Sequence, residues 1–396
     1  MKLLKNKGSV IYIGMSYYNN WYLSRELRKK GWTTLLVNND ANPESQKFYH
    51  GYDHKLEVPR SVWQLIKQLF YFIYAPFRYK VFHFTGVRNI TYLPSRYTRG
   101  LHKIWPRLFP EAWDIRLLRF FGRKIVYSYV GCLDGVSQTS FSKWGPEPVC
   151  NICPWKFVPA VCSDEGNLKW GKLRNELSDY LVLTGGNRAD YNLTGKMHEV
   201  PEFYCLDSNV WNPNLTIPKK RRLNLPKGTV KLFHTVGNFS LRTKNGVNIK
   251  STHIYLPLIE KLKSEGYKIE LIFPRDIPNL EIRYLQVQAD IILDMLSFGW
   301  FGATSREGMM LGKPVICYLN PEFLEIVRKE IPDYVNGLPI ISATPQNVRE
   351  VLIDLITNPK KRIEIGRQSR EFALKWHSAE VSAKRFDSIY SELLGL

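Results

Sequence analysis

The segment from residue 288 to residue 318 constrains the fold of this chain more than any other part. It reads QADIILDMLSFGWFGATSREGMMLGKPVICY, and its apolar start predicts a buried strand. Gly299 and Gly302 predict a turn, after which a helical stretch leads to a second strand at Val315. A strand, a glycine turn and a helix start place backbone N–H groups and the positive end of the helix dipole where an anion can bind. The segment therefore predicts a parallel α/β unit with a ligand site at the start of its helix.

The same alternation of strands and helices runs through the whole chain. In the first half, the apolar runs that read as strands are 10–13, 33–37, 81–84, 124–130 and 180–183. A second set of strands and helices starts near residue 231, so the predicted class is α/β with parallel sheets. A stretch rich in proline and asparagine, followed by a basic run, separates the two sets. We therefore expect two domains, with their boundary between residues 209 and 210.

The stretch 62–74 has the apolar spacing of a helix and is apolar almost all round. Its aromatic residues would suit a helix that lies in a membrane interface. A helix that is apolar on all sides is more often buried in a protein core, and burial is therefore the favoured prediction.

Positive charge is concentrated in the first half of the chain. Residues 1–200 hold 29 basic and 15 acidic residues, and the net charge of the whole chain is +20. The stretch 78–124 holds eleven basic and two acidic residues, with aromatic residues between them. Such a surface could attract an anionic membrane, a lipid-diphosphate substrate or the phosphates of nucleic acid. A basic surface that is only solvated and binds no partner is an equal alternative. No nucleic-acid-binding motif is present, so nucleic acid is the least favoured partner.

Two features bear on the cellular compartment. No run of eighteen or more apolar residues is present, which predicts no transmembrane helix. The basic N-terminus leads into a short apolar run without a cleavage site, and this run reads as a first strand rather than a signal peptide. We therefore expect a cytoplasmic protein, with peripheral contact at the inner face of the membrane as an open alternative.

Four of the six cysteines lie close together in the chain: Cys132, Cys150, Cys153 and Cys162. A Cys-x2-Cys pair with two flanking cysteines in a cytosolic chain is typical of a structural zinc site with four thiolates. The proline-rich loop 132–162 shows little regular structure, and a metal would give it a core. Buried free thiols are the alternative, because the spacing of the cysteines is irregular.

The run EGMMLGKPVICY, which begins at Glu307, resembles the donor-binding segment of GT-B glycosyltransferases. The resemblance is to the retaining, nucleotide-sugar-dependent type (glycosyl transferases group 1, family 4-like), whose signature is Glu-x7-Glu followed by Gly-Lys-Pro-Val. Glu307 matches the second glutamate, and Gly299 stands in place of the first. The resemblance implies two doubly wound Rossmann-like domains with a cleft between them. Residues 1–209 would bind the acceptor and 210–377 the nucleotide-sugar, and the last helix, 378–396, would pack back on the first domain.

The same resemblance implies which side chains act on the donor. Arg242 and Lys250 would hold its diphosphate, with Lys244 as an alternative. Two cations there would neutralise the charge that develops on the leaving nucleoside diphosphate, which is the main electrostatic task in glycosyl transfer. Glu307 would accept hydrogen bonds from ribose hydroxyls, and Asp134 in the first domain would bind the acceptor or serve as a weak base.

Further residues are expected to line the donor site. They are Gly14, Asn19, Asn20, Arg275, Asp294, Gly299, Gly302, Ala303 and Thr304. The first three belong to the loop after strand one, which would face the cleft. The amides of residues 302–304 would meet phosphate or sugar oxygens, and Arg275 would border the base. Asp294 is a candidate for the carboxylate that Gly299 cannot supply.

These features predict a hexosyltransferase-type enzyme. It would move a hexose-like sugar from a nucleotide-sugar donor to a glycan, lipid-linked or other acceptor, with retention of configuration. The nucleotide-sugar is its co-substrate, the candidate zinc is structural, and we expect no divalent metal in catalysis. Two alternatives stay open: a catalytically inactive GT-B-shaped binder of nucleotide-sugars or polyanions, and then a nucleic-acid-associated zinc protein.

Overall fold

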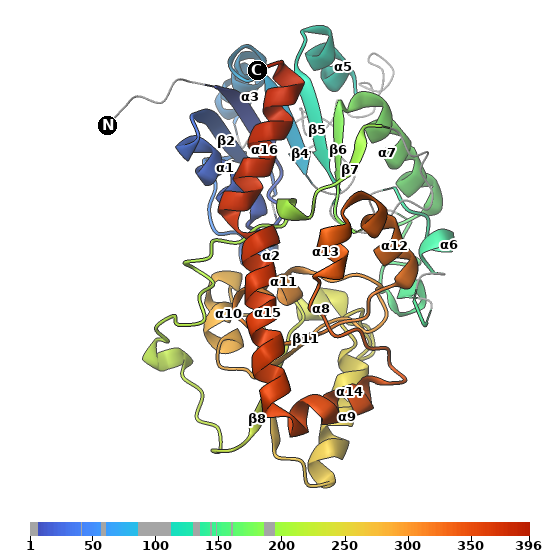
Figure 1. Cartoon of the computed structure of the whole chain (residues 1–396). Coiled ribbons are helices and arrows are strands. Elements are labelled where there is room, and N and C mark those ends of the chain that lie inside the picture. Colours follow the sequence, from blue (N-terminus) through green and yellow to red (C-terminus); the bar gives the residue numbers. More distant parts are fainter. Residues whose placement is uncertain are drawn as a thin grey trace.

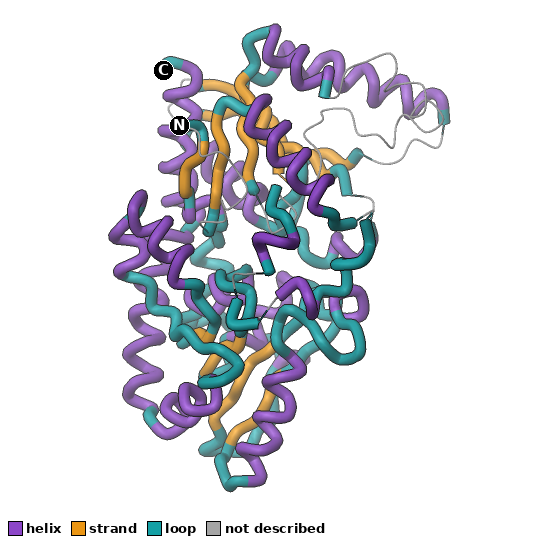
Figure 2. Tube along the Cα trace, turned by 90° about the vertical axis from the view of Figure 1, so that its right-hand side faces the viewer, coloured by secondary structure: helices purple, strands orange, loops and turns teal. Residues whose placement is uncertain are grey.

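The strands of the protein form two separate parallel sheets, which lie one above the other along the molecule (Figures 1 and 2). The computed structural model describes residues 7–40, 42–56, 61–85, 112–129, 135–142, 145–147, 149–159, 161–185 and 195–396. Within these ranges, the side chains at positions 65, 68, 69, 71 and 72 are not described. The sheets are built from the first and second halves of the chain, respectively.

The first sheet has the strand order β3-β2-β1-β4-β5-β6-β7, and every neighbouring pair is parallel. Its strands are β1 (Gly8–Ile13), β2 (Trp32–Asn38), β3 (His54–Lys55), β4 (Val81–Thr85), β5 (Lys124–Ser128), β6 (Tyr180–Leu183) and β7 (Met197–Glu199). The helices of this half are α1 (Asn19–Lys29), α2 (Pro43–Gln46), α3 (Val62–Arg78), α5 (Trp113–Phe120), α6 (Gln138–Phe141) and α7 (Asp164–Leu177). The five strands predicted for this half are all present.

Helices cover both faces of the first sheet, and successive residues of β1 show this directly. Val10 and Tyr12 pack in one apolar core with residues of α1 and of the last helix, α16 (Ala379–Leu394). Ile11 and Ile13 point the other way, into a second core with residues of α3, α5 and α7. A strand covered on both faces needs apolar residues at every position, which is why β1 reads as a continuous apolar run.

The second sheet is smaller, with the parallel strand order β11-β10-β8-β9. Its strands are β8 (Val230–His234), β9 (Ile269–Ile272), β10 (Ile291–Leu293) and β11 (Val315–Ile316). The helices before α16 are α8 (Phe239–Arg242), α9 (Thr252–Ser264), α10 (Asn279–Gln286), α11 (Ala303–Met310), α12 (Pro321–Glu330), α13 (Pro332–Asn336), α14 (Val348–Thr357) and α15 (Pro359–His377). The predicted α/β class with two Rossmann-like domains is confirmed.

The chain passes twice between the halves, and the two crossings are hydrogen-bonded to each other. The backbone N–H of Leu206 donates to the carbonyl of His377 at 2.8 Å, and that of Ala379 donates to Leu206 at 2.9 Å. After this crossing, α16 runs back along the first sheet, where Asp387 accepts a 2.8 Å hydrogen bond from the indole of Trp32 (Figure 1). The terminal helix therefore packs on the first domain as expected, while the boundary at residues 209 and 210 stays a prediction.

The favoured prediction for the stretch 62–74, burial in the core, is wrong. Helix α3 includes this stretch and continues to Arg78, and seven of its apolar side chains are exposed: Val62, Trp63, Ile66, Phe70, Ile73, Tyr74 and Phe77. The physical reason is that α3 meets the core through Ala75, on its opposite side, and no described residue covers the exposed side. Among the described helices, none has the length and apolar content that crossing a membrane requires.

The loop after β1 should tolerate no side chain at Gly14. Its φ is +102°, and an added Cβ would lie 1.9 Å from the carbonyl oxygen of Thr85 on the neighbouring strand. We expect Gly14→Ala to lower the free energy of unfolding by more than about 2 kcal/mol in urea denaturation. Gly122→Ala is the matched control, because Gly122 also has a positive φ (+71°) but no atom within 4 Å of the added Cβ. Equal losses in the two variants would contradict the steric argument.

Buried histidines should make the fold sensitive to acid. Burial lowers the pKa of His83 to about 3, and its ring bonds Tyr390 of α16 and Ser128 of β5, both at 2.6 Å. Below the ordinary histidine pKa of about 6.5, only the unfolded chain takes up this proton, so stability falls as the pH falls. From pH 7 to pH 5 the loss should be about 2 kcal/mol for each such histidine. Urea denaturation should show that His83→Asn loses less stability over this interval than the parent does. Equal losses in the two proteins would show that His83 has the same pKa in the folded and the unfolded chain.

Candidate functional site

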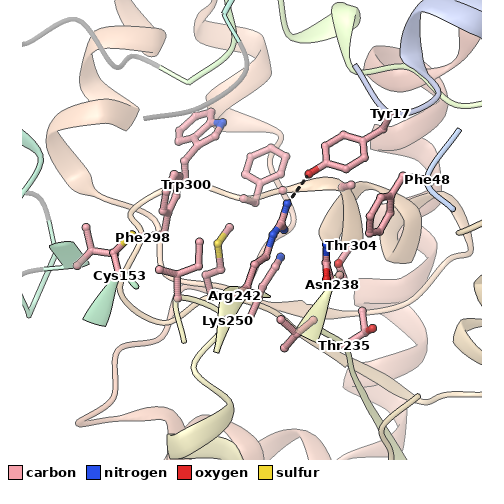
Figure 3. Close-up of a pocket in the computed structure, with 18 of the residues that line it drawn as sticks. Tyr17, Phe48, Cys153, Thr235, Asn238, Arg242, Lys250, Phe298, Trp300 and Thr304 are labelled. Atoms are coloured by element: carbon pink, nitrogen blue, oxygen red, sulfur yellow. Dashed lines mark hydrogen bonds between the residues drawn. The ribbon is translucent and has the colours of Figure 1, made fainter. Parts of the chain in front are cut away.

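A cavity of about 450 Å³ lies between the two sheets and is lined by both halves of the chain. Tyr129, Thr184 and Thr235, which follow β5, β6 and β8, are among its lining residues. The carboxyl ends of the parallel strands of both sheets therefore face this cavity, which is where open α/β sheets bind ligands. Figure 3 shows Arg242 and Lys250 of the second half at the centre, with Tyr17 and Phe48 of the first half beside them at the right.

The helix start predicted from the glycine turn opens onto this cavity. Gly302, Ala303 and Thr304 line it, and α11 begins at Ala303 without a side-chain cap from any described residue. The first amides of a helix and its positive dipole end favour an anion at this place. Gly299 is different, because it is not a lining residue and its carbonyl accepts a 2.8 Å hydrogen bond from the amide of Asn320. Its φ of +89° shows that it forms the turn rather than the site.

Lys250 lines the cavity, and Asp294 fixes its position. The two side chains form an ion pair, and Ser305 donates a 2.5 Å hydrogen bond to the other carboxylate oxygen of Asp294. Burial by itself would raise the pKa of Asp294, but the Lys250 charge and these hydrogen bonds bring it below its ordinary value. Asp294 is fully buried and does not line the cavity. Asp294 thus positions Lys250, and the direct sugar contact expected from sequence stays a prediction.

Arg242 reaches across the cavity toward the first domain. Its Nη2 donates a 3.2 Å hydrogen bond to the hydroxyl of Tyr17, the dashed contact in Figure 3. The Arg242 charge lowers the pKa of the Tyr17 hydroxyl. Lys244, the alternative cation from the same loop, is exposed and is not among the lining residues. The structure therefore brings Arg242 and Lys250 together at the cavity and leaves Lys244 at the surface.

Glu307 lines the cavity, and its carboxylate accepts three hydrogen bonds within the protein. Its carboxylate accepts from the Tyr18 hydroxyl at 2.9 Å, from Asn279 Nδ2 at 2.9 Å and from Gln286 Nε2 at 2.7 Å. Burial raises the pKa of Glu307, although these three donors oppose the shift. Because Tyr18 belongs to the first half and the other residues to the second, Glu307 joins the two halves at the edge of the cavity.

An aromatic stack supports Glu307 and was not foreseen from sequence. The rings of His50, Tyr18 and Trp211 contact one another, with centroid distances of 4.8 Å from His50 to Tyr18 and 5.3 Å for each of the other two pairs. His50 also bonds Asn279 Oδ1 and the Tyr22 hydroxyl, both at 2.8 Å. Burial lowers the pKa of His50 to about 4, so it is neutral near pH 7. These residues come from distant parts of the chain, and no local spacing pattern could have linked them.

The loop after β1 contributes to the cavity through other residues than those predicted. Asn20 Nδ2 donates to the Gly14 carbonyl at 2.8 Å, and Asn19 Nδ2 donates to the Ser16 carbonyl at 2.7 Å. Gly14, Asn19 and Asn20 do not line the cavity, whereas Tyr17 does. The predicted residues therefore shape the loop, and the side chain that it presents to the cavity is Tyr17.

Arg275 also lies outside the cavity lining. Its guanidinium packs over the rings of Phe239 and Phe273, at 4.3 and 5.1 Å from their centroids. The residues that follow it in the chain, Asp276 and Ile277, do line the cavity. These neighbours therefore form the cavity wall at this point, and the contact of Arg275 with the base stays a prediction.

The cysteine-rich loop forms one wall of the cavity. Cys150, Cys153 and Cys162 line it, and burial raises the pKa of the Cys150 thiol to about 11. Within the described ranges, no three His, Cys, Asp or Glu side chains come together as a metal would require. Cys132, the fourth predicted ligand, lies outside the described residues, as does Asp134. The part of the loop that is described thus lends no support to the zinc prediction.

Comparisons with known proteins identify the fold. No protein-family model matches the chain, and no curated protein sequence matches it. Among solved structures, sucrose-phosphate synthase from Thermosynechococcus elongatus superposes with a TM-score of 0.58 at 15% identity, covering 98% of this chain and 99% of that one.

Two further structures agree with this likeness. HepE from Anabaena, solved in complex with UDP-glucose, has a TM-score of 0.54 at 11% identity and covers 97% of this chain and 100% of its own. The catalytic domain of starch synthase IV from Arabidopsis thaliana, bound to ADP and acarbose, has a TM-score of 0.53 at 12% identity, with coverages of 99% and 100%. The protein therefore has the GT-B fold, the architecture of these glycosyltransferases.

The effects of mutating Lys250 and Asp294 on the stability of the fold should depend on each other. We expect Lys250→Met to lower the free energy of unfolding by about 3–5 kcal/mol, because it leaves the Asp294 carboxylate buried without a counter-charge. Adding Asp294→Asn removes that charge and should recover part of the loss. Chemical denaturation of both variants and the parent protein measures this coupling. A double variant no more stable than Lys250→Met would show that the pair does not carry the effect.

Proposed function

We propose that this protein is a glycosyltransferase of the hexosyltransferase type, which transfers a hexose-like sugar from a nucleotide-sugar to a glycan or lipid-linked acceptor. The observation that carries the proposal is the convergence of Arg242, Lys250 and the start of α11 on one cavity between two Rossmann-like domains. The GT-B fold of the chain agrees with it. HepE and starch synthase IV, which share this fold, were solved with UDP-glucose and with ADP.

The charges at the cavity suit a nucleoside diphosphate. Glycosyl transfer breaks the bond between the sugar and the diphosphate, and negative charge develops on the leaving phosphate oxygen. Lys250 and Arg242 supply positive charges for that oxygen, and the amides at the start of α11 add hydrogen-bond donors. Because Asp294 holds Lys250 in place before the donor binds, little reorganisation is needed during the reaction. The leaving phosphate can take the acceptor proton, which is the route expected for a retaining enzyme without a strong protein base.

A second observation supports a sugar beside these cations. Trp300 and Phe298 line the cavity, and the indole Nε1 of Trp300 is buried without a hydrogen-bond partner among the described residues. Aromatic side chains offer an apolar surface for a ring, and a buried indole N–H normally has a partner. A hydroxyl group of the bound sugar would provide that partner.

An inactive nucleotide-sugar binder is the alternative that a specific observation favours. Gly299 stands where the resembled signature has a glutamate, and Asp294 does not reach the cavity to replace it. A protein of this kind would bind the donor through the same cations but release no nucleoside diphosphate. Binding and turnover must therefore be measured separately.

Binding of the donor should be visible as thermal stabilisation. A panel of UDP-, GDP-, ADP- and CMP-sugars is tested, and a ligand at a hundredfold its dissociation constant should stabilise the fold by about 2.7 kcal/mol. Arg242→Met should reduce this shift strongly, since the variant lacks a diphosphate contact.

The matched control is Lys244→Met, which removes a cation from the same loop at an exposed position. It should leave the shift intact. No shift with any nucleotide-sugar, or equal shifts in both variants, would contradict the proposed site. Release of nucleoside diphosphate in the presence of a glycan or lipid-linked acceptor then separates the transferase from the inactive binder.

A further inference from the structure

The exposed side of α3 is a continuous apolar stripe. Its seven residues are Val62, Trp63, Ile66, Phe70, Ile73, Tyr74 and Phe77, and each is between 49% and 75% exposed. Most neighbours along this set are three or four positions apart, so they lie on one side of the helix. Ala75, on the opposite side, is fully buried in the core of the first sheet. The helix therefore rests on the protein by one side and presents aromatic and branched residues on the other.

Helix α5 adds exposed apolar residues to the same outer layer. Its inner residues, Ile115 and Leu118, belong to the same core as Ala75 of α3, so both helices cover the same face of the sheet. Leu117 and Phe120 of α5 and Phe121 directly after it are exposed, and Phe120 is 82% exposed. Large apolar groups gathered in this way on a protein surface mark an interaction site.

The charged residues of α3 and of the residues directly after it are all positive. Residues 61–85, which contain α3, include Lys67, Arg78 and Lys80 and no acidic residue. Lys67 Nζ lies 5.4 Å from the centre of the Trp63 ring, and Arg78 Nη1 lies 3.5 Å from the Tyr74 hydroxyl. The cations thus lie along the border of the aromatic stripe. This arrangement of apolar and cationic groups complements the surface of a lipid bilayer, where anionic head groups cover a hydrocarbon layer.

We propose that α3 docks the protein on an anionic lipid bilayer, lying in the plane of the interface with its stripe among the acyl chains. A second copy of this chain is the less suitable occupant, because it would bring Lys67 and Arg78 of both copies together. The proposal does not rest on the proposed transferase function, since α3 contributes no residue to the cavity. A protein docked in this way would act where a lipid-linked acceptor is anchored.

Co-sedimentation of the full chain with lipid vesicles tests the proposal. Vesicles of phosphatidylcholine mixed with phosphatidylglycerol should bind the protein, and vesicles of phosphatidylcholine alone should bind it far less. The double variant Phe70→Ser/Phe77→Ser should bind the anionic vesicles at least about tenfold more weakly, since each phenylalanine contributes apolar burial. Both side chains are exposed, so the variant should keep the melting temperature of the parent.

Ile363→Ser is the matched control, because Ile363 on α15 is 73% exposed and lies in the other half of the protein. It should bind vesicles as the parent does. A blue shift of tryptophan fluorescence on vesicle binding should shrink in Trp63→Phe, which places α3 itself in the interface. Unchanged binding by the Phe70→Ser/Phe77→Ser variant would overturn the proposal. The proposal would also be overturned if the parent protein did not bind vesicles but formed dimers in analytical ultracentrifugation, and the double variant did not form them.

Discussion

The buried carboxylate of Glu307 is the interaction on which the arrangement of the two domains at the cavity depends. A charged group without water must be satisfied by hydrogen bonds, and its three donors come from both halves of the chain. Tyr18 brings the loop after β1 to the second domain, and the stack of His50 on Tyr18 and Trp211 holds that contact. The hydrogen bonds of Glu307 therefore help to set the width of the cavity, together with the contacts of Arg242 with Tyr17 and of His50 with Asn279.

The two cations at the cavity are held in different ways. Lys250 is fixed from below by a buried carboxylate, and an ion pair of this kind is costly to break by removing one partner. Arg242 is half-buried and meets the first domain through the Tyr17 hydroxyl. The first arrangement keeps one positive charge in place at all times. The second lets the position of the other charge follow the distance between the domains, so an open form would lack the Arg242 contact with Tyr17.

Helix α3 and the β1 strand show that apolar content alone does not decide burial. Both are rich in apolar residues, but β1 has helices on both sides and α3 has the sheet on one side only. The difference lies in what the surrounding chain places beside each element. One side of such an amphipathic helix packs on the core of the protein. The other side, with cations at its border, stays exposed and can contact a partner.

Local sequence patterns determined five of the seven strands of the first sheet, the two strands around the glycine turn, and the helix that carries Glu307, because alternation, turn chemistry and helix starts act between near neighbours. The resemblance to glycosyltransferases singled out Arg242 and Lys250 in the segment after β8, and the structure brings both to the cavity. Only the tertiary structure decided that Asp294 holds Lys250, that Tyr17 rather than Asn19 or Asn20 faces the cavity, and that α3 is exposed. The reason is physical: a sequence shows which residues could be buried or paired, but their partners lie far along the chain and are set by how the sheets and helices pack.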